Sequence, residues 1–213
     1  ADECPTGAFC PEGAGAEPRD PYPVPCPPGS YANTTGHPVC DLCPLGFYCL
    51  EAAINPVLCD AGFFCPVNST TAKQEPCPAG TFYNQQGAQK ASDCQPCPAG
   101  SFCPEGTADP TAPANLVPRG TYSDEGQGRP TPCPVGRYGN ASGASSVFHC
   151  PLCDPGMFCD QPGGIVPTGP CDPGFFCSIG SPTSQPAFNG PVTFELVAPE
   201  YGDICPRGSY CPE

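Results

Sequence analysis

The twenty cysteines of this chain recur in one short pattern, which we call a hook: Cys, two residues, Gly, one residue and an aromatic. In a tight hook a second cysteine follows the aromatic directly. In an open hook the second cysteine comes 14 or 17 positions after the first. Seven tight and three open hooks use all twenty cysteines, so none remains as a free nucleophile. The sequence therefore predicts ten loops closed by disulfides.

Each hook also contains the residues of a tight turn. Most hooks begin Cys-Pro-x-Gly, where proline presets φ and glycine allows a turn geometry that a side chain resists. The hooks at Cys153 and Cys171 read Cys-Asp-Pro-Gly, and there we expect the turn to lie one residue further along.

The aromatic stands five residues after the first cysteine in every hook. We expect it to cover the disulfide, because an aromatic buries a large apolar area; a stacking surface for a ligand is the alternative. The ten aromatics are Phe9, Tyr31, Tyr48, Phe64, Phe82, Phe102, Tyr138, Phe158, Phe176 and Tyr210.

The rest of the composition makes the disulfides necessary. Leu, Ile, Val and Phe number 33 of 213 residues, Pro and Gly number 61, and the net charge is −14. Such a chain would normally be disordered, but small units without a core can be held by disulfides. A seven-residue loop contributes about 2.4 kcal/mol in the chain-entropy model. The predicted fold class is small and disulfide-rich: tandem cysteine-rich repeats with short β-hairpins and little helix, forming an elongated rod.

The order of the hooks divides the chain into five parts. One hook, Val117–Ser123, keeps the Pro, Gly and aromatic but has Val and Ser in place of its cysteines. The pattern stops in mid-repeat, so we expect the native chain to continue. The parts are 1–25, a partial repeat with a Pro-rich spacer; 26–66, a module; 67–132, a module with the cysteine-free hook; 133–178, a module; and 179–213, a spacer with a short strand at 192–197 and a partial repeat.

Three N-glycosylation sequons, at Asn33, Asn68 and Asn140, fit an oxidising compartment. Asn33 and Asn140 stand seven residues after the first cysteine of an open hook, as does Asn84 in the third open hook. We expect these turns to face water. No apolar run is long enough to span a membrane and no signal peptide is evident, so we place the chain outside the cell, secreted or on the cell or flagellar surface.

Several chemistries are not supported by the residues. Only seven basic residues are present, which excludes a nucleic-acid surface. The acids are scattered rather than spaced as calcium ligands. The repeated Cys-x2-Cys pairs invite a zinc or redox interpretation, but His37 and His149 are the only histidines and no strand–helix context surrounds the pairs. Two histidines in Pro- and Gly-rich loops give no basis for a nucleophile and base. We expect a non-enzyme without a cofactor.

The stretch CPAGTFYNQQGAQKASDCQPCPAGSFCPEGT, from Cys77 to Thr107, and its relatives at Cys26 and Cys133 resemble ephrin-receptor-like cysteine-rich repeats. These are related in spacing to tumour-necrosis-factor-receptor modules, and versions rich in CPxGxFCPxG are typical of large surface proteins of protists and algae. The resemblance covers most of 1–177 and 205–213 and implies a mastigoneme-type glycoprotein of flagellar fibres. The sequence differs from the receptors in two respects. Its tight hooks outnumber its open hooks, and it shows no kinase, membrane span or ligand-binding head.

Two disulfide connectivities fit the spacing. Receptor-type modules would cross neighbouring hooks, joining Cys43 to Cys59 and Cys49 to Cys65. A crossed scheme leaves Cys97 and Cys103, next to the cysteine-free hook, and the isolated pairs Cys4/Cys10 and Cys205/Cys211 without partners in a neighbouring hook. Pairing within each hook accounts for all of them, so we favour it. The pairs are Cys4–Cys10, Cys26–Cys40, Cys43–Cys49, Cys59–Cys65, Cys77–Cys94, Cys97–Cys103, Cys133–Cys150, Cys153–Cys159, Cys171–Cys177 and Cys205–Cys211.

These features predict an extracellular structural glycoprotein, a repeat segment of a filament or coat. We expect it to associate with itself or with other fibre or coat proteins, and to carry N-linked and O-linked glycans. A receptor or adhesion ectodomain that binds a protein ligand is the alternative. A multi-headed protease inhibitor is less well supported, because five residues between cysteines are too few for a reactive loop.

Overall fold

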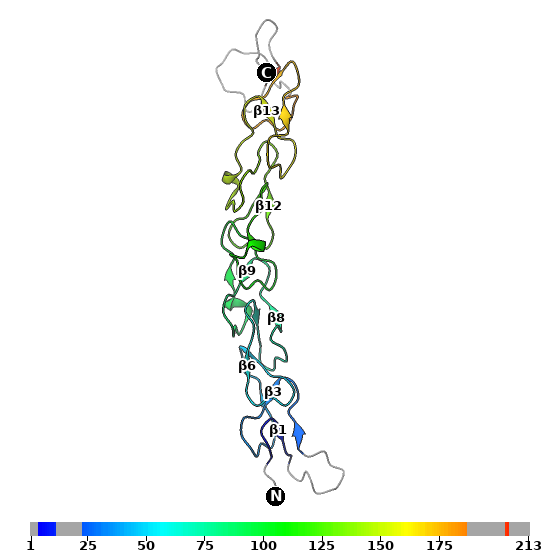
Figure 1. Cartoon of the computed structure of the whole chain (residues 1–213), viewed down its shortest axis with the longest axis vertical. Helices are drawn as coiled ribbons and strands as arrows, with labels where there is room; N and C mark the ends of the chain where they lie inside the picture. Colours follow the sequence, from blue (N-terminus) through cyan, green and yellow to red (C-terminus); the bar gives the residue numbers. More distant parts are fainter. Residues whose placement is uncertain (1–3, 12–22, 187–202, 205–213) are drawn as a thin grey trace. The chain divides into compact units, whose positions relative to one another are not determined.

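The computed structural model describes residues 4–11, 23–186 and 203–204. The chain divides into two compact units, the first made of Ala1–Cys97 with Cys103–Pro110 and the second of Pro98–Phe102 with Thr111–Glu213. Within each unit the hooks follow one another in chain order (Figure 1). The strand expected at 192–197 lies outside the described residues.

Most of the described hooks begin an antiparallel pair of very short strands. The first strand holds the fifth and sixth residues of the hook, and the second holds the two residues before the next hook. Eight such pairs occur in the described part of the chain, which confirms the prediction of short β-hairpins. They are β1 (Ala8–Phe9) with β2 (Val24–Pro25), β3 (Ser30–Tyr31) with β4 (Asp41–Leu42), β5 (Phe47–Tyr48) with β6 (Val57–Leu58), β7 (Phe63–Phe64) with β8 (Glu75–Pro76), β9 (Thr81–Phe82) with β10 (Gln95–Pro96), β11 (Thr121–Tyr122) with β12 (Thr131–Pro132), β13 (Met157–Phe158) with β14 (Gly169–Pro170), and β15 (Phe175–Phe176) with β16 (Asp203–Ile204).

Two hooks form a single bridge instead of a strand pair. These bridges join Ser101 to Leu116 and Arg137 to Leu152. Helix is limited, in the described ranges, to three 3₁₀ turns: η1 (Ala91–Asp93), η2 (Pro113–Asn115) and η3 (Val147–His149). The prediction of little helix is therefore confirmed.

All the described hooks use the same turn register. The hook glycine, the fourth residue, has φ between +78° and +90° and occupies the third position of the turn. The N–H of the fifth residue donates to the carbonyl of the second, as from Phe47 to Pro44 at 3.2 Å. We expected the turn to move in the Cys153 and Cys171 hooks, but Met157 donates to Asp154 in the same way. That prediction is wrong because glycine, which alone tolerates this φ cheaply, fixes the register.

Two backbone hydrogen bonds at the hook glycine tie each hook to the next. The glycine N–H donates to the carbonyl of the seventh residue of the next hook, the one directly after the aromatic, at 2.8–2.9 Å. The glycine carbonyl accepts from the N–H of the first residue of that hook, at 2.8–3.2 Å. Gly46, for example, donates to Cys65 and accepts from Cys59. Both bonds recur at all nine steps between consecutive described hooks.

A second turn, which we call the outer turn, follows each hook and extends the contacts one hook further back. In eight of the described outer turns the central residue has positive φ and donates its N–H to the carbonyl of the first residue of the preceding hook at 2.8–3.0 Å, as Gly87 does to Cys59. The exception is Gly126, after the cysteine-free hook, which has positive φ without this bond. The carbonyl of a bonded central residue such as Gly87 lies against the hook glycine two hooks back: a Cβ on Gly46 would stand 2.6 Å from the Gly87 oxygen. Most hooks therefore contact the next two hooks along the chain.

The buried interior of these repeats is a series of cysteines and small side chains. Fifteen of the eighteen described cysteines are buried, together with residues such as Ala32, Ala88, Ser69 and Ser181. Because the outer turns and hook glycines bring backbones into contact, the space between them accommodates little more than a sulfur pair.

The close approach at the hook glycine predicts different costs for two Gly→Ala substitutions. Gly46 and Gly36 have similar φ values of +81° and +77°, so an alanine at either site costs about 1–2 kcal/mol in backbone conformation. Only at Gly46 does the new Cβ meet a backbone oxygen, whereas nothing lies within 4 Å of Gly36. We expect Gly46→Ala to cost a further ~1–3 kcal/mol of unfolding free energy. Urea unfolding under non-reducing conditions measures both, and equal losses would contradict the packing argument.

Candidate functional site

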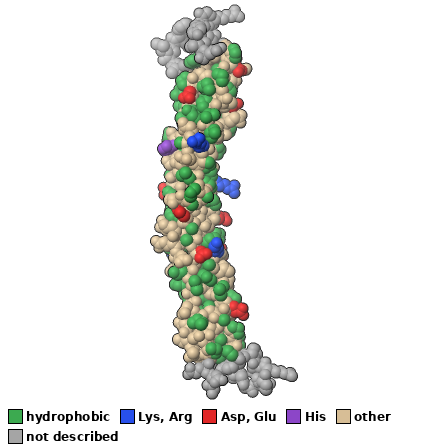
Figure 2. All heavy atoms as spheres, in the orientation of Figure 1, with side chains coloured by type: hydrophobic (Ala, Val, Ile, Leu, Met, Phe, Trp, Pro, Cys, Tyr) green, Lys and Arg blue, Asp and Glu red, His purple; other side chains and the backbone are tan. Residues whose placement is uncertain are grey.

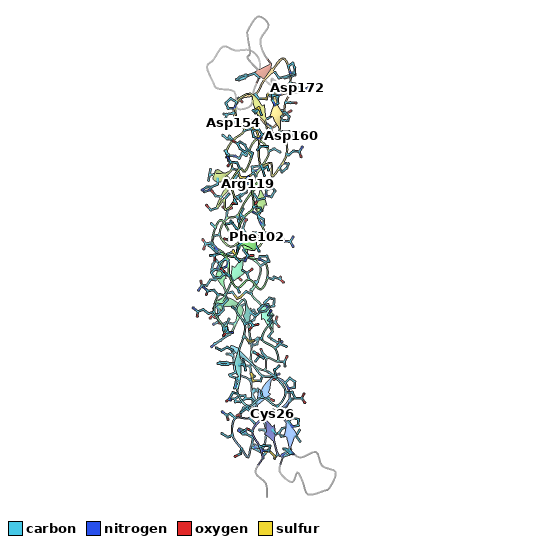
Figure 3. The ribbon with its side chains drawn as sticks, viewed as in Figure 1. Cys26, Phe102, Arg119, Asp154, Asp160 and Asp172 are labelled. Atoms are coloured by element: carbon cyan, nitrogen blue, oxygen red, sulfur yellow. A yellow bond between two sulfur atoms is a disulfide. The ribbon has the colours of Figure 1, made fainter. Side chains whose placement is uncertain are left out.

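The structure joins the cysteines within hooks and not across them. The Cα–Cα distances of the bridges are 5.8–6.3 Å, within the usual range for disulfides. Cys26, in one of these bridges, lies near the β1 end of the first unit (Figure 3). No cysteine of the described segments is free, and the Cys205–Cys211 pair lies outside them. The nine bridges are Cys4–Cys10, Cys26–Cys40, Cys43–Cys49, Cys59–Cys65, Cys77–Cys94, Cys97–Cys103, Cys133–Cys150, Cys153–Cys159 and Cys171–Cys177.

The cysteine-free hook, Val117–Ser123, has the backbone geometry of the others. Its glycine, Gly120, donates to Gly139 at 2.8 Å and accepts from Cys133 at 2.8 Å. Val117 and Ser123 have 0% exposed surface and occupy the places of a disulfide pair. The hydrogen bonds and turn chemistry are therefore sufficient to form a hook, and the disulfide adds covalent closure.

This equivalence predicts that a disulfide can be added at the cysteine-free hook. We expect the double variant Val117→Cys/Ser123→Cys to oxidise and to raise the unfolding free energy by about 2.4 kcal/mol, the chain-entropy value for a seven-residue loop. Peptide mass mapping after alkylation of the unreduced protein detects the bridge. Val117→Ala/Ser123→Ala is the control for loss of the native side chains. Two alkylated thiols at 117 and 123 would contradict the equivalence.

The hook aromatics are less buried than we expected. None of the nine described ones is fully buried: eight, from Phe9 to Phe158, are half-buried, and Phe176 is 42% exposed. Tyr210 lies outside the described residues. The hook aromatics therefore lie partly on the surface of the repeats.

Sequence reasoning missed the residue immediately before each hook. This leading residue packs against the central glycine of an outer turn, the one that comes after the next hook along the chain. Leu58, Leu116 and Leu152 each lie beside such an outer-turn glycine. A Cβ on Gly143, for example, would stand 3.3 Å from Leu116 Cδ1. The signal was available, because from the Cys26 hook onwards the position is always proline or a branched aliphatic. The leading residues are Pro25, Leu42, Leu58, Pro76, Pro96, Leu116, Pro132, Leu152, Pro170 and Ile204.

The three sequon asparagines are exposed but occupy two different settings. Asn33 and Asn140 stand two residues after the aromatic of an open hook, as does the exposed Asn84. Asn68 is the central residue of an outer turn, with φ +68°, and its side-chain oxygen lies against Gly29. Asparagine is among the few non-glycine residues that adopt this conformation readily, so the backbone alone accounts for Asn68.

The shared setting of Asn33, Asn84 and Asn140 predicts that a new sequon at Asn84 will be used. Asn84 is followed by Gln85 and Gln86, so Gln86→Thr completes the sequon in an exposed turn. We expect this variant, expressed in a secretory eukaryotic host, to gain one N-glycan. A mobility shift that N-glycosidase removes, and glycopeptide mapping, measure it. Gln85→Thr places the same residue one position too early and serves as the control; no gain with Gln86→Thr would mean that the turn is not accessible to the transferase.

The two histidines occupy similar open-hook loops and bond to nearby hydroxyls. His37 Nε2 lies 2.7 Å from the Thr34 hydroxyl, and His149 Nδ1 lies 3.1 Å from the Ser146 hydroxyl. Among the described side chains, no three of His, Cys, Asp or Glu gather as a metal site. The described part of the chain also contains no helix with the length and apolar character needed to cross a bilayer.

Large apolar side chains lie on the surface and are unevenly distributed. In the first unit, every strongly exposed one that is described falls between Val39 and Val67. Figure 2 shows hydrophobic side chains of all sizes along the described part of the visible face. In the second unit the most exposed is Phe148 of η3, at 84%. Surface-exposed large apolar groups are expected at binding surfaces.

The chain matches no protein-family model and no curated protein. What the sequence and the fold establish together is a series of tandem cysteine-rich repeats with many disulfides and short hairpins. Such disulfide content indicates an oxidising environment, of which the extracellular space is the usual one.

Proposed function

We propose that this chain is a repeat segment of an extracellular structural glycoprotein, part of a filament or a cell-surface coat, and that it has no catalytic activity. The observation that carries the proposal is the uniform hydrogen-bond pattern, which repeats at all nine described steps between hooks. A repeat in which every step has the same backbone bonds suits a load-bearing or spacing element, because each hook supports the next two.

Three further features support this role. Disulfides close nine loops, so tension on the chain cannot open them without breaking covalent bonds. The net charge of −14 and the exposed sequon asparagines keep the surface hydrated. The resemblance of the hooks to ephrin-receptor-like repeats of protist and algal surface proteins gives a flagellar fibre subunit as the most specific form of the proposal.

A receptor or adhesion ectodomain is the second candidate. The concentration of exposed aliphatics between Val39 and Val67 favours it, since a protein ligand would bind such a surface as well as another subunit would. The two functions differ in assembly: a fibre subunit associates with copies of itself, whereas an ectodomain stays monomeric and binds a different protein.

Electron microscopy of the native, unreduced material separates the two. We expect regular filaments whose axial repeat is shorter than the roughly 700 Å of a fully extended chain of this length, because the hooks shorten the path of the backbone. Filaments that lose their regular repeat after reduction would link assembly to the disulfides. Isolated single chains at the same concentration would contradict the structural role and direct attention to a ligand.

A further inference from the structure

We propose that the Arg119–Gly120 peptide bond, in the cysteine-free hook Val117–Ser123, is a cleavage site for a trypsin-like serine protease, which reaches the bond when this hook opens. The inference goes beyond the proposed function and holds for either candidate role. It derives from three departures from the repeat that coincide at one hook: the arginine, the missing disulfide and an outer turn that lacks its usual bonds.

The arginine is unusual for its place in a hook. It stands in the third position, directly before the hook glycine, where every other described hook has Thr, Ala, Pro, Val or Leu. Arg119 and Pro118 are both exposed, and Figure 3 labels Arg119 within the second unit. A trypsin-like protease holds such a side chain against an aspartate, in the pocket that precedes the cleaved bond. Pro118 fixes its own φ and favours an extended Val117, and extended backbone is the form in which a peptide lies along a cleft.

Hydrolysis of this bond would divide the chain. The hydroxyl of a water molecule bonds to the Arg119 carbonyl carbon, the C–N bond breaks, and the Gly120 nitrogen takes up a proton, which leaves a carboxylate at Arg119 and a new amino terminus at Gly120. Each of the nine described disulfides lies wholly within residues 1–119 or within residues 120–213, so none holds the products together. A cut at the same position of any other described hook would leave its two ends joined by that hook's own disulfide.

Most other basic residues of the chain offer no such cut. Lys90 and Arg137 lie inside the disulfide-closed loops of two open hooks, so cleavage there leaves the chain joined. Arg129 is followed by Pro130, whose ring replaces the N–H on the leaving side of the bond. Two further arginines lie outside the described residues: Arg19 and Arg207.

Lys73 is the other described basic residue at which a single cut would divide the chain. Its segment keeps the usual outer-turn bonds, such as the one from the Asn68 N–H to the Cys43 carbonyl at 2.9 Å. The Lys73 Nζ also lies over the Phe63 ring, 5.7 Å from its centroid, and has to leave that ring to enter a protease pocket. We therefore expect the protease to cut after Lys73 more slowly than after Arg119.

The folded hook protects the bond, so cleavage depends on opening of the hook. Arg119 and Gly120 are the two central residues of the tight turn, in which Thr121 donates its N–H to the Pro118 carbonyl at 3.3 Å. A protease binds an extended segment rather than a turn. Because the cysteine-free hook has no covalent bridge, it can open by breaking hydrogen bonds alone.

The outer turn that directly follows this hook makes neither of the bonds that its equivalents make to the preceding hook. In the other eight described outer turns the central residue donates to the first residue of that hook, and the seventh residue of that hook donates to the residue after the central one, as Cys65 does to Ala88 at 3.0 Å. Here Gly126 lacks the bond to Cys97, and the Cys103 N–H lacks the bond to Gln127. Fewer bonds therefore hold the segment after Ser123, which lowers the local stability next to the cleavage site.

Limited trypsin digestion of the full, unreduced chain tests the site, with the products separated on a denaturing gel and their termini mapped by mass spectrometry. We expect the first products to be residues 1–119 and 120–213. Arg119→Gln should abolish this cut. The oxidised double variant Val117→Cys/Ser123→Cys should slow it at least about tenfold, because the added bridge opposes opening and the cleavage rate follows the population of the open hook.

The matched control moves the same turn sequence into a bridged hook. Ala99→Arg/Arg119→Gln places Pro-Arg-Gly between Cys97 and Cys103, at an exposed position. We expect cleavage after residue 99, measured after reduction, to be at least about tenfold slower than cleavage after Arg119 in the parent chain. Unchanged thermal unfolding of the two variants that contain Arg119→Gln excludes misfolding as the cause.

Native chains that begin at Gly120 would support the proposal. It is overturned if trypsin cuts after Lys73 before it cuts after Arg119, if the site moved to the bridged hook is cut as fast as the original, or if every chain of the native material is intact at Arg119.

Discussion

At seven hook glycines, from Gly7 to Gly136, two backbones approach more closely than any side chain would allow, and many contacts of the repeat depend on that approach. The positive φ of the glycine turns the chain, its N–H and carbonyl bond to the next hook, and the carbonyl of an outer turn two hooks on lies against its Cα. These contacts are between backbone atoms, so they are indifferent to most side chains. Successive hooks from Cys26 to Cys171 begin 16 to 20 residues apart, and the segments between them absorb the difference without disturbing the bonds.

The disulfides and the hydrogen bonds have separate roles. The cysteine-free hook has the turn bond and both glycine bonds of the other hooks with Val117 and Ser123 in the interior, so the hook geometry does not require sulfur. The cysteines instead reduce the conformational freedom of the unfolded chain, which a fold with so few buried aliphatics needs. The same narrow interior explains why the larger aliphatics are outside. Between touching backbones there is room for a sulfur pair or one valine, so residues such as Leu50 and Val39 remain on the surface.

The sequence was sufficient to predict the class of fold, because Cys, Pro and Gly act locally: each hook contains its own turn, and its strands pair with residues a short distance along the chain. It was insufficient for properties that arise between repeats. The turn register in the Cys153 hook depends on the position that Gly156 needs in order to bond to the next hook. The order of Asp154 and Pro155 in the sequence does not show that requirement. The partial exposure of Phe102 and its equivalents is a property of the assembled repeats that the motif alone does not show. The leading residues were visible as a pattern of Pro and Leu before each hook, but without the outer turn they had no evident partner.

Because the backbone of each repeat is so nearly the same, whatever distinguishes one repeat from another must lie in its exposed residues. Most of these are small, polar or acidic, and spread along a surface that repels its own copies. Exposed large apolar residues such as Leu50 and Phe148 are exceptions. In an assembly of repeat proteins such exceptions can set register: identical repeats alone would let neighbouring subunits slide by one step at little cost, whereas a contact made by residues that occur once per chain gives a single preferred offset. A regular filament built from near-identical repeats therefore needs irregular residues at a few defined positions.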